Sequence, residues 1–478
     1  MISMKKAKTE ENISASTSRK FKIKEILGFT QPFDNVAVEG WVRTKRDSKA
    51  LSFIELNDGT SKNIQIVVEA STPNYEEIKK LTIGSSIKVE GNLVASPAKG
   101  QKFEISAKNI KIYGFANPEL YPLQKKELSM DYLRTIAHLR PRTNIFSAIF
   151  RIRSELAFAI NKFFHDKGFM YVHTPILTSS DCEAVGHMFR VTTLEMEKLP
   201  KTKDGKIDYS KELFGKTSFL TGSGQLHGEL FATALGNIYT FGPTFRTENS
   251  NTFRHASEFW MIEPEMAFYD VEDLMKLEEE FIKSLIKQIL ENCKDDMEYL
   301  NEKVEPGLID KLKKVMESDF KHVTYTEAVE ILKKSGKKFE VKPEWGTDLN
   351  SEHEKFLTEE HFKGPIIAYN YPKEFKSFYM KQNDDKKTVR GTDVLVPGIG
   401  EIIGGSQRED DIEKLINAIK EKGYDPKDYE WFLDTRRFGT VPHSGFGLGF
   451  ERMLMFITGV QNIRDVIPFP RTPKTLEY

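Results

Sequence analysis

The chain has 478 residues, of which 39% are hydrophobic and 29% are charged, and its formal net charge is −1. This length allows roughly two to four domains, and the composition excludes a chain that is disordered throughout. No apolar run approaches the roughly 18 residues of a membrane span, so we expect no membrane partner. The small net charge hides an asymmetry, because residues 1–124 carry a net charge of +5 and the remainder carries −6.

Residues 1–20 are rich in Lys and Ser and lack the apolar centre of a secretory signal. We interpret them as a disordered tail. An organellar transit peptide is less favoured, because Glu10 and Glu11 are acidic and Arg19 is the only arginine. The two cysteines, Cys182 and Cys293, are too far apart for metal-ligand spacing or a disulfide framework. The sequence therefore predicts a reducing, cytoplasmic location.

Residues 21–115 contain about five short runs with the alternating apolar pattern of strands, separated by Gly and Asn-Asp turns. This pattern predicts a small β-barrel or sandwich. Residues 116–140 follow as a linker, with Pro118 and Pro122 near its start.

Residues 141–478 predict an α+β domain with an antiparallel sheet and flanking helices. An apolar stripe at helical spacing predicts a helix over Ile145–Lys167, and Asp270 is a candidate N-cap of a second helix. We expect strands at 364–370, 375–382 and 392–404. The Lys- and Glu-rich segment 296–362 predicts an insertion, for which the sequence indicates no chemistry.

The first candidate site combines Phe245–Glu248 with the stretch Arg254–Glu265. The second stretch alternates as a strand, so Phe259 and Glu263 share one face. An aromatic side chain and carboxylates beside two arginines and a histidine suit a phosphorylated ligand with a stackable base. A half-exposed strand with surface ion pairs is an equally weighted alternative.

The second candidate site is the run Ser444–Arg452, in which three alternate glycines precede Glu451 and Arg452. Alternate glycines allow a ligand or another backbone to approach closely. The spacing does not match a dinucleotide-binding fingerprint.

These stretches occur together in one known family. The glycine-rich strand with Glu451–Arg452 resembles motif 3 of the class II aminoacyl-tRNA synthetases. Phe245–Phe259 resembles their motif 2, and the long helix that leads to Thr174–Pro175 resembles motif 1. Within the aspartyl, asparaginyl and lysyl subgroup, the chain is similar to the bacterial asparaginyl enzymes from about residue 22 onward. Further matching segments are Ser223–Gln225, Glu401–Arg408 and Asn462–Pro473.

The resemblance implies an N-terminal OB-fold anticodon domain and a class II catalytic domain. It implies that ATP and L-asparagine form asparaginyl-adenylate, with release of diphosphate, and that asparagine is then transferred to tRNA(Asn), with release of AMP. Neither step needs an enzyme nucleophile, so positioning and charge stabilisation carry the catalysis. The resemblance also implies a homodimer through motif 1, whose apolar stripe provides a face to bury.

By position, the resemblance places Arg246 at the α-phosphate of ATP and Glu248 beside the adenine. Phe259 would stack on one side of the adenine, and Arg452 would cover the other. Arg246 and Arg452 are the candidate catalytic residues. Glu401 matches a ligand of Mg²⁺, which commonly binds one or two carboxylates together with phosphate oxygens. The candidate ATP-binding residues are Arg246, Glu248, Arg254, His255, Phe259, Glu401 and Arg452.

The resemblance implies an amino-acid site formed by Glu183, Gln225, Glu263 and Arg408. Aspartate-specific relatives carry a lysine where this chain has Gly228. The carboxylate of Glu263 would accept a hydrogen bond from the substrate amide and repel an aspartate carboxylate. Glu229 is an alternative for this role.

The same resemblance assigns Arg43, Phe53 and Gln65 to the anticodon. Phe53 would stack on a base and Gln65 would bind it by hydrogen bonds, while Arg43, Lys45 and Arg46 would contact phosphates. From burial preferences alone, a place in the barrel core is the favoured interpretation of Phe53.

Three other functions remain open at this point. An aspartyl-tRNA synthetase is disfavoured by Gly228 and Glu263. A non-catalytic RNA-binding paralogue would be expected to lose Arg246, Glu401 or Arg452, and all three are present. An ammonia-dependent asparagine synthetase would have no use for the N-terminal barrel.

Overall fold

The structure is a computed structural model, and it describes residues 18–98, 100–124, 128–180, 182, 188–248 and 252–478. The chain divides into two compact units, Met1–Ala148 and Ile149–Tyr478. None of the helices in the described residues is long and apolar enough to cross a membrane.

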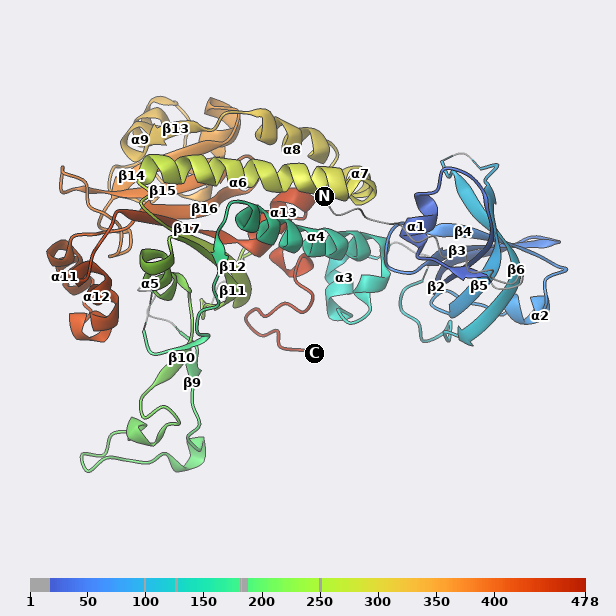
Figure 1. Cartoon of the computed structure of the whole chain (residues 1–478), viewed down its shortest axis with the longest axis horizontal. Coiled ribbons are helices and arrows are strands. Elements are labelled where there is room, and N and C mark those ends of the chain that lie inside the picture. The colour runs from blue at the N-terminus through green and yellow to red at the C-terminus, as the bar shows by residue number, and fades with distance from the viewer. Residues whose placement is uncertain (1–17, 99, 125–127, 181, 183–187, 249–251) are drawn as a thin grey trace, which may run out of the picture. The chain divides into compact units, whose positions relative to one another are not determined.

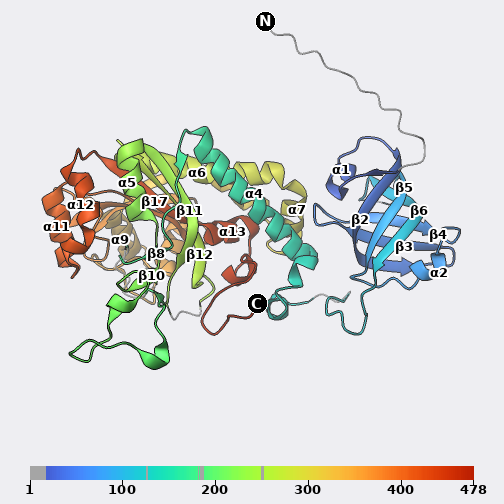
Figure 2. The same cartoon turned by 60° about the horizontal axis from the view of Figure 1, so that its bottom comes forward.

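The first unit is built around a closed barrel. Its strands are β2 (Phe33–Asp47), β3 (Leu51–Asn57), β4 (Ile64–Glu69), β5 (Ser86–Ala95) and β6 (Phe103–Gly114). Pairing between β2 and β5 closes the barrel, and the short strand β1 (Arg19–Lys20) lies parallel to β2. Alternation fixes which side chains point inward, so that Ile54, Leu56 and Ile66 are buried in the core. The prediction of an OB-fold barrel with about five strands is confirmed (Figure 2).

Short helices complete this unit. Helices α1 (Ile23–Leu27) and α2 (Tyr75–Ile78) belong to the barrel, and α3 (Met130–Thr135) follows it. The division between the units falls after Ala148, within the long helix α4 (Asn144–Asp166).

The second unit contains an eight-stranded sheet in the order β13-β14-β15-β16-β17-β12-β11-β7. Its strands are β7 (Met170–Tyr171), β11 (Asn237–Phe245), β12 (Glu258–Ala267), β13 (Lys321–Thr324), β14 (Ile366–Pro372), β15 (Thr388–Val396), β16 (Gly400–Gln407) and β17 (His443–Gly449). The pairings are antiparallel except at the two edges, where β13 and β7 run parallel to their neighbours.

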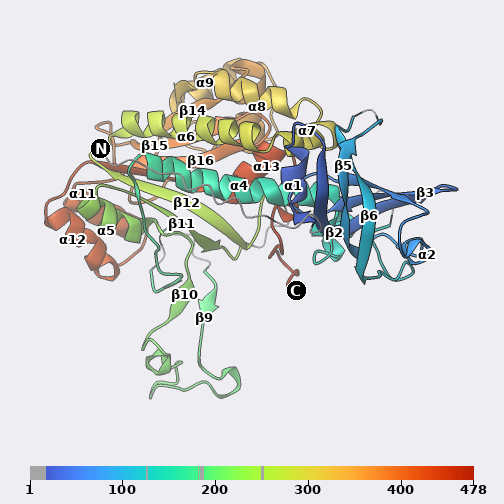
Figure 3. The ribbon, with the colours of Figure 1, turned by 45° about the vertical axis from the view of Figure 1, so that its right-hand side comes forward.

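One face of this sheet is covered by α4 and α6 (Val271–Asn292) (Figures 1 and 3). The rings of Phe163 and Phe164 in α4 contact Phe281 in α6. Phe164 also stacks on Tyr239 of β11, and Phe281 contacts Phe446 of β17. The predicted N-cap of α6 is present, because the Asp270 side chain accepts a hydrogen bond from the Asp273 N–H.

The remaining helices flank the sheet or lie at its ends. They are α5 (Gln225–Leu235), α7 (Lys294–Lys303), α8 (Leu308–Glu317), α9 (Tyr325–Lys334), α10 (Ser351–Lys355), α11 (Ile412–Glu421), α12 (Glu430–Arg437) and α13 (Phe450–Thr458). The segment 296–362 contributes strand β13 to the sheet edge. A separate small sheet, with the order β8 (Leu177–Thr178), β10 (Ser218–Leu220) and β9 (Arg190–Val191), projects from this unit.

Two strand predictions were wrong in detail. The segment 375–382 forms turns and isolated bridges, because Phe378 and Tyr379 pack into a cluster with α11 and α12 instead of joining the sheet. The segment 392–404 is a hairpin of β15 and β16. Its turn contains Gly398 and Gly400, both at positive φ, and an alternating pattern continues across a hairpin without marking the reversal.

Candidate functional site

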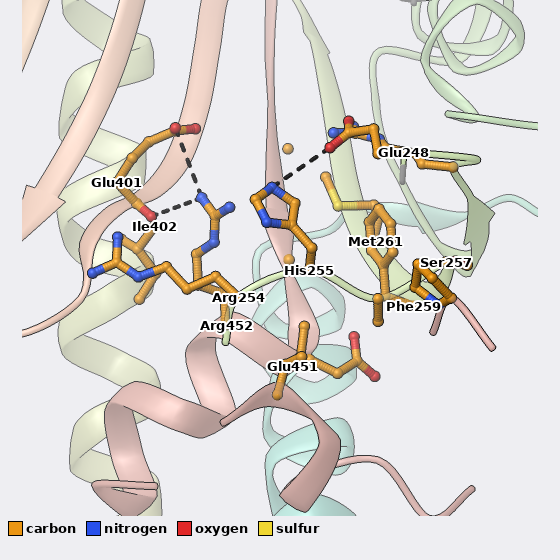
Figure 4. Close-up of a pocket in the computed structure, with 16 residues that line it drawn as sticks. Glu248, Arg254, His255, Ser257, Phe259, Met261, Glu401, Ile402, Glu451 and Arg452 are labelled. Carbon is orange, nitrogen blue, oxygen red and sulfur yellow. Dashed lines mark hydrogen bonds and ion pairs between the residues drawn. The ribbon is translucent and has the colours of Figure 1, made fainter. Parts of the chain in front are cut away.

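A cavity of about 190 Å³ lies on the sheet face opposite to α4 and α6. Its walls come from β12, β16, β17, the start of α13 and the loop before β12 (Figure 4). All the residues predicted to bind ATP line this one cavity, although they come from three separate parts of the sequence. These residues are Arg246, Glu248, Arg254, His255, Phe259, Glu401 and Arg452.

The floor of the cavity follows from the alternation of β12 and the glycines of β17. Phe259 and Met261 point into the cavity from alternate positions of β12. Gly447 lies beside Met261, where an added Cβ would be 2.8 Å from the methionine methyl group. Glycine at this position therefore keeps the floor flat enough for a ring to lie on it.

Charged side chains that line the cavity are paired with one another within the protein. The Arg452 Nη1 donates to the Glu401 carbonyl oxygen at 2.9 Å and lies 3.7 Å from the Glu401 Oε2. His255 Nε2 lies 3.5 Å from Glu248 Oε2, and the Arg246 guanidinium lies 5.3 Å from the centre of the Phe259 ring. Cations and carboxylates thus surround a surface that can accept an aromatic base.

Asp393 is a site residue that the sequence analysis missed. An added Cβ at Gly404 would lie 3.3 Å from Glu401 Oε1 and 3.7 Å from Asp393 Oδ1, so the two carboxylates converge above this glycine. Burial raises the pKa of Glu401, and the negative charge of Asp393 adds to this while Arg452 opposes it. Lys376 Nζ lies 2.8 Å from Asp393 Oδ2.

This pair of carboxylates fits a hard divalent cation that takes its other ligands from phosphate and water. In the parts of the chain that the structure describes, no group of three or more His, Cys, Asp or Glu side chains has the geometry of a complete metal site. A two-carboxylate arrangement is typical of Mg²⁺ bound together with a nucleotide.

Gln225, Glu263 and Arg408 belong to a second, more buried group beside the cavity. Gln225 is the first residue of α5, and its Nε2 donates to Glu229 Oε1 at 3.0 Å. Glu229 Oε1 lies 3.9 Å from Arg408 Nε. Glu183 lies outside the described residues.

Glu263 is engaged by the loop that precedes α5. Its carboxylate accepts hydrogen bonds from the Ser223 hydroxyl and, at 3.0 Å, from the Gly224 N–H. The Thr240 hydroxyl lies 3.3 Å from the same carboxylate. Glu263 therefore holds the Ser223–Gln225 loop in place, whatever else it binds.

A fully buried ionic network lies below this group, and most of it was missed by the sequence analysis. Arg408 binds both oxygens of Glu265, with Nε 3.1 Å from Oε2. Arg436 Nη2 lies 2.7 Å from Glu229 Oε2, and His443 Nε2 lies 3.1 Å from the same oxygen. Glu265 was detectable as the next residue on the Glu263 face of β12, whereas no local pattern marks Arg436 or His443.

The pKa values of the two acids in this network, Glu265 and Glu229, are shifted in opposite directions. Burial raises the pKa of Glu265 to about 8, and the nearby charge of Glu229 contributes to that shift while Arg408 opposes it. Burial also acts on Glu229, but the charge of Arg436, the hydrogen bond with His443 and the charge of Arg408 outweigh it and hold its pKa below the usual range. Arg408 is thus fixed between two carboxylates.

Glu451, the residue before Arg452, links the start of α13 to α4 and β12. Glu451 Oε1 accepts from Arg153 Nη2 of α4 at 2.8 Å, and Glu451 Oε2 accepts from the Trp260 N–H of β12 at 2.9 Å. The Glu451 side chain is buried, so this pair is held in a low-dielectric environment. It anchors the first turn of α13 and hence the backbone that carries Arg452.

The predicted anticodon residues lie on the barrel. Phe53 and Gln65 point to the outer surface of the adjacent strands β3 and β4, where the residues paired with them are Val67 and Glu55. Phe53 is half-buried and lies outside the barrel core, contrary to the interpretation from burial preferences, and the Arg46 guanidinium lies 5.1 Å from its ring centre.

Gln65 and Arg43 form hydrogen bonds with other residues of the barrel. Gln65 Nε2 donates to Glu104 Oε2 at 3.0 Å, and Arg43 Nη2 donates to Asn57 Oδ1 at 3.3 Å. The barrel thus presents an aromatic ring and hydrogen-bonding groups on one outer surface, an arrangement suited to single-stranded bases.

Comparison with known families agrees with this geometry. Residues 129–473 match the family described as tRNA synthetases class II (D, K and N), and residues 36–113 match an OB-fold nucleic acid binding domain. An asparagine–tRNA ligase of Cytophaga hutchinsonii is 56% identical over 463 residues, covering 96% of this chain and all of the relative. One from Treponema denticola is 57% identical over 469 residues, covering 95% and 99%.

A similar solved structure is that of the asparaginyl-tRNA synthetase from Pyrococcus horikoshii complexed with asparaginyl-adenylate. Its TM-score is 0.83 and its sequence identity is 34%, and the match covers 96% of this chain and all of the other.

Proposed function

The chain belongs to the asparagine–tRNA ligases of class II, and from this premise we propose which of its residues carry each step of the reaction. It is an enzyme that uses ATP to activate asparagine and then attaches the amino acid to tRNA. The observation that supports our assignment most strongly is the convergence of seven motif residues on one cavity. These residues lie far apart in the sequence, and the fold makes them neighbours.

We assign the cavity to ATP. The adenine stacks on Phe259, and Glu248 lies beside its edge. Arg246 stabilises the negative charge that develops at the α-phosphate as the asparagine carboxylate attacks it, while Arg254 and His255 meet the outer phosphates. Arg452 covers the adenine from the other side. No side chain forms a covalent bond, so the rate depends on orientation and charge.

We assign Mg²⁺ to the pair Glu401 and Asp393. When bound there, Mg²⁺ would neutralise triphosphate charge and orient the leaving diphosphate. The convergence of both carboxylates above Gly404 supports this assignment, since a side chain at that position would fill the space between them and the nucleotide.

We assign the buried group to asparagine. Arg408 binds the side-chain oxygen, Gln225 and Glu183 bind the α-amino group, and Glu263 disfavours a second carboxylate. An added Cβ at Gly228 would lie 3.5 Å from the Glu265 side chain, so this position adjoins the buried group, and it carries no lysine. A site that leaves a charged or polar group unpaired with the wrong substrate discriminates strongly.

We propose that the barrel binds the anticodon of tRNA(Asn) through Phe53, Gln65 and Arg43, with the net positive charge of residues 1–124 assisting at the phosphates. We further propose a cytoplasmic homodimer. Exposed apolar side chains on α4 and on the edge strand β7 support this, namely Phe158, Met170 and Tyr171, which are 63%, 51% and 52% exposed.

The test is ATP–diphosphate exchange with asparagine and aspartate side by side, followed by charging of tRNA(Asn). We expect exchange that depends on asparagine and an alkali-labile ester of asparagine on the tRNA 3′ end. Exchange with aspartate alone would assign the chain to the aspartyl enzymes, and exchange with neither amino acid would favour a non-catalytic RNA-binding role.

A further inference from the structure

The segment Ser351–His361 forms hydrogen bonds with residues that line the ATP cavity and with the neighbouring hairpin. It consists of α10 and a π-helical turn over Phe356–His361. Arg254 Nη1 donates to the Ser351 hydroxyl at 3.4 Å, the Glu401 N–H donates to Glu354 Oε2 at 3.4 Å, and the Gly398 N–H donates to Glu359 Oε1 at 3.0 Å. The insertion that had no assigned chemistry therefore contacts two residues of the proposed phosphate and metal site.

The Glu354 carboxylate lies directly against the turn between β15 and β16. Gly400 in this turn has a φ of +80°, and an added Cβ there would clash with Glu354 Oε2 and lie 3.6 Å from Arg254 Nη1. Glu354 and Arg254 thus meet over the same glycine. Glu359, from the π-helical turn that follows α10, reaches the same hairpin through the Gly398 N–H.

The backbone of Glu401 is held at both of its polar groups. Its N–H is bound by Glu354, and its C=O accepts from Arg452 Nη1 at 2.9 Å. Because the two bonds hold both polar groups of the residue, they fix the backbone from which the Glu401 side chain extends. Outer residues of this kind commonly set the orientation of a metal ligand.

Helix α10 is itself firmly anchored, although it is short. The Asn350 side chain accepts from the N–H groups of Glu352 and His353, each at 3.1 Å. The Glu352 carboxylate accepts from the N–H groups of Glu340 and Val341 at 3.0 and 2.8 Å, and His353 Nε2 lies 2.8 Å from the Val341 oxygen. The segment can therefore act as a fixed support.

From these contacts we infer that Glu354 is a positioning residue for the adenylation step, which orients Glu401 toward the metal and, with Ser351, Arg254 toward the outer phosphates. This inference rests on the proposed function of the cavity. It gives the 296–362 insertion a role in the use of Mg²⁺·ATP, distinct from asparagine selection.

The test compares three variants of the full chain in ATP–diphosphate exchange at varied Mg²⁺, ATP and asparagine. We expect Glu354→Ala to raise the half-saturating concentrations of Mg²⁺ and ATP about tenfold, in the range typical of residues that support a metal ligand. The KM for asparagine should not change. Glu354→Gln should keep most of the activity, because its amide oxygen still accepts from the Glu401 N–H.

The matched control is Glu360→Ala. Glu360 lies on the same segment and pairs with Lys337 at the surface, so its loss should leave all three constants unchanged. Unaltered Mg²⁺ and ATP dependence in Glu354→Ala would overturn the inference. So would an equal rise in the KM values for ATP and asparagine that Glu354→Gln fails to rescue, because this pattern indicates a general structural defect.

Two further measurements keep the test decisive. If Glu354→Ala fails to fold, Ser351→Ala should raise the KM for ATP about tenfold without affecting asparagine, and no change there would contradict the role of the segment. Equilibrium binding of ATP with and without Mg²⁺ is measured in parallel. Wild-type protein that binds Mg²⁺·ATP but shows no exchange would refute the proposed function, while a binding difference between wild type and Glu354→Ala would still support the positioning role.

Discussion

The ATP cavity and the asparagine group lie side by side on one sheet face but are built in different ways. The cavity is open, and some of its charged side chains are only loosely paired, such as His255 and Glu248 at 3.5 Å and Arg452 and the Glu401 carboxylate at 3.7 Å. The asparagine group is buried, and Arg408 is held between two carboxylates. The difference indicates that the first site adapts to a flexible, charged ligand, whereas the second is fixed in advance to read a small difference between amino acids.

Loss of one charged partner should therefore reduce the stability of the protein more in the buried network than in the ATP cavity. Arg436→Met leaves Glu229 with close contacts to Gln225 and His443 and a distant one to Arg408. Because its nearest charged partner is lost, we expect a decrease of about 3–5 kcal/mol in unfolding free energy, as for other broken buried ion pairs. Urea denaturation of the variant and wild type measures this. The double variant Glu229→Gln with Arg436→Met should recover part of the loss, and an unchanged midpoint in the single variant would contradict the network.

The open cavity should tolerate substitution structurally but not catalytically. Arg246→Ala should lower kcat for exchange by about 10²–10³-fold, because one preorganised donor at a developing charge contributes about 2.7–4 kcal/mol. The melting temperature should stay close to that of wild type. Arg246→Lys serves as the control for charge without the planar guanidinium, and full activity of the alanine variant would remove Arg246 from the α-phosphate.

The difference between the cavity and the buried network also explains how well each could be predicted from the sequence. Seven residues of the cavity were predicted, because they lie in motifs whose resemblance to a known family is visible along the chain, whereas Asp393 was missed. The network is assembled from α5, β12, β16, α12 and β17, with one or two residues from each. No spacing links Arg436 to Glu229, which is 207 residues away, and only the folded sheet brings them together.

The fold shows the same limits. Alternation and helical stripes predicted the barrel, α4 and the N-cap of α6, because these depend on neighbours in the sequence. The segment 375–382 was wrongly assigned to a strand, since the pattern cannot tell whether Phe378 packs against a sheet or against helices.

The barrel offers a third region to compare, where a half-buried aromatic ring lies on the outer surface. Phe53→Ala should weaken tRNA(Asn) binding by about 1–3 kcal/mol, the usual contribution of one stacked base. We expect a raised KM for tRNA in charging assays and unchanged ATP–diphosphate exchange. Loss of exchange or a large drop in melting temperature would assign Phe53 to the stability of the barrel instead.

A pH-dependent effect concerns Glu278, a fully buried acid on the helix-covered face of the sheet. The Thr392 hydroxyl donates to its Oε1 at 2.8 Å. Burial raises its pKa to about 8, while Thr392 and Arg408 lower it and Asp393 raises it. The folded protein therefore keeps this proton after the unfolded chain has lost it, so stability falls as the pH rises from about 4.5 to about 8.

Glu278→Gln should reduce this slope while keeping the bond to Thr392, and the raised pKa of Glu265 accounts for part of the slope that remains. Melting temperatures at pH 6 and pH 9 should therefore differ less in the variant than in wild type. An identical difference in both proteins would show that Glu278 is not the group that titrates.

The most direct measurement of the central claim is the ratio of kcat/KM for asparagine to that for aspartate in ATP–diphosphate exchange, in wild type and Glu263→Gln. Our account predicts a high ratio in wild type and a marked fall in the variant, because the charge that repels a second carboxylate is gone while the KM for ATP is unchanged. An unchanged ratio together with unchanged activity toward asparagine would contradict it, and would shift the selection of asparagine to Glu229.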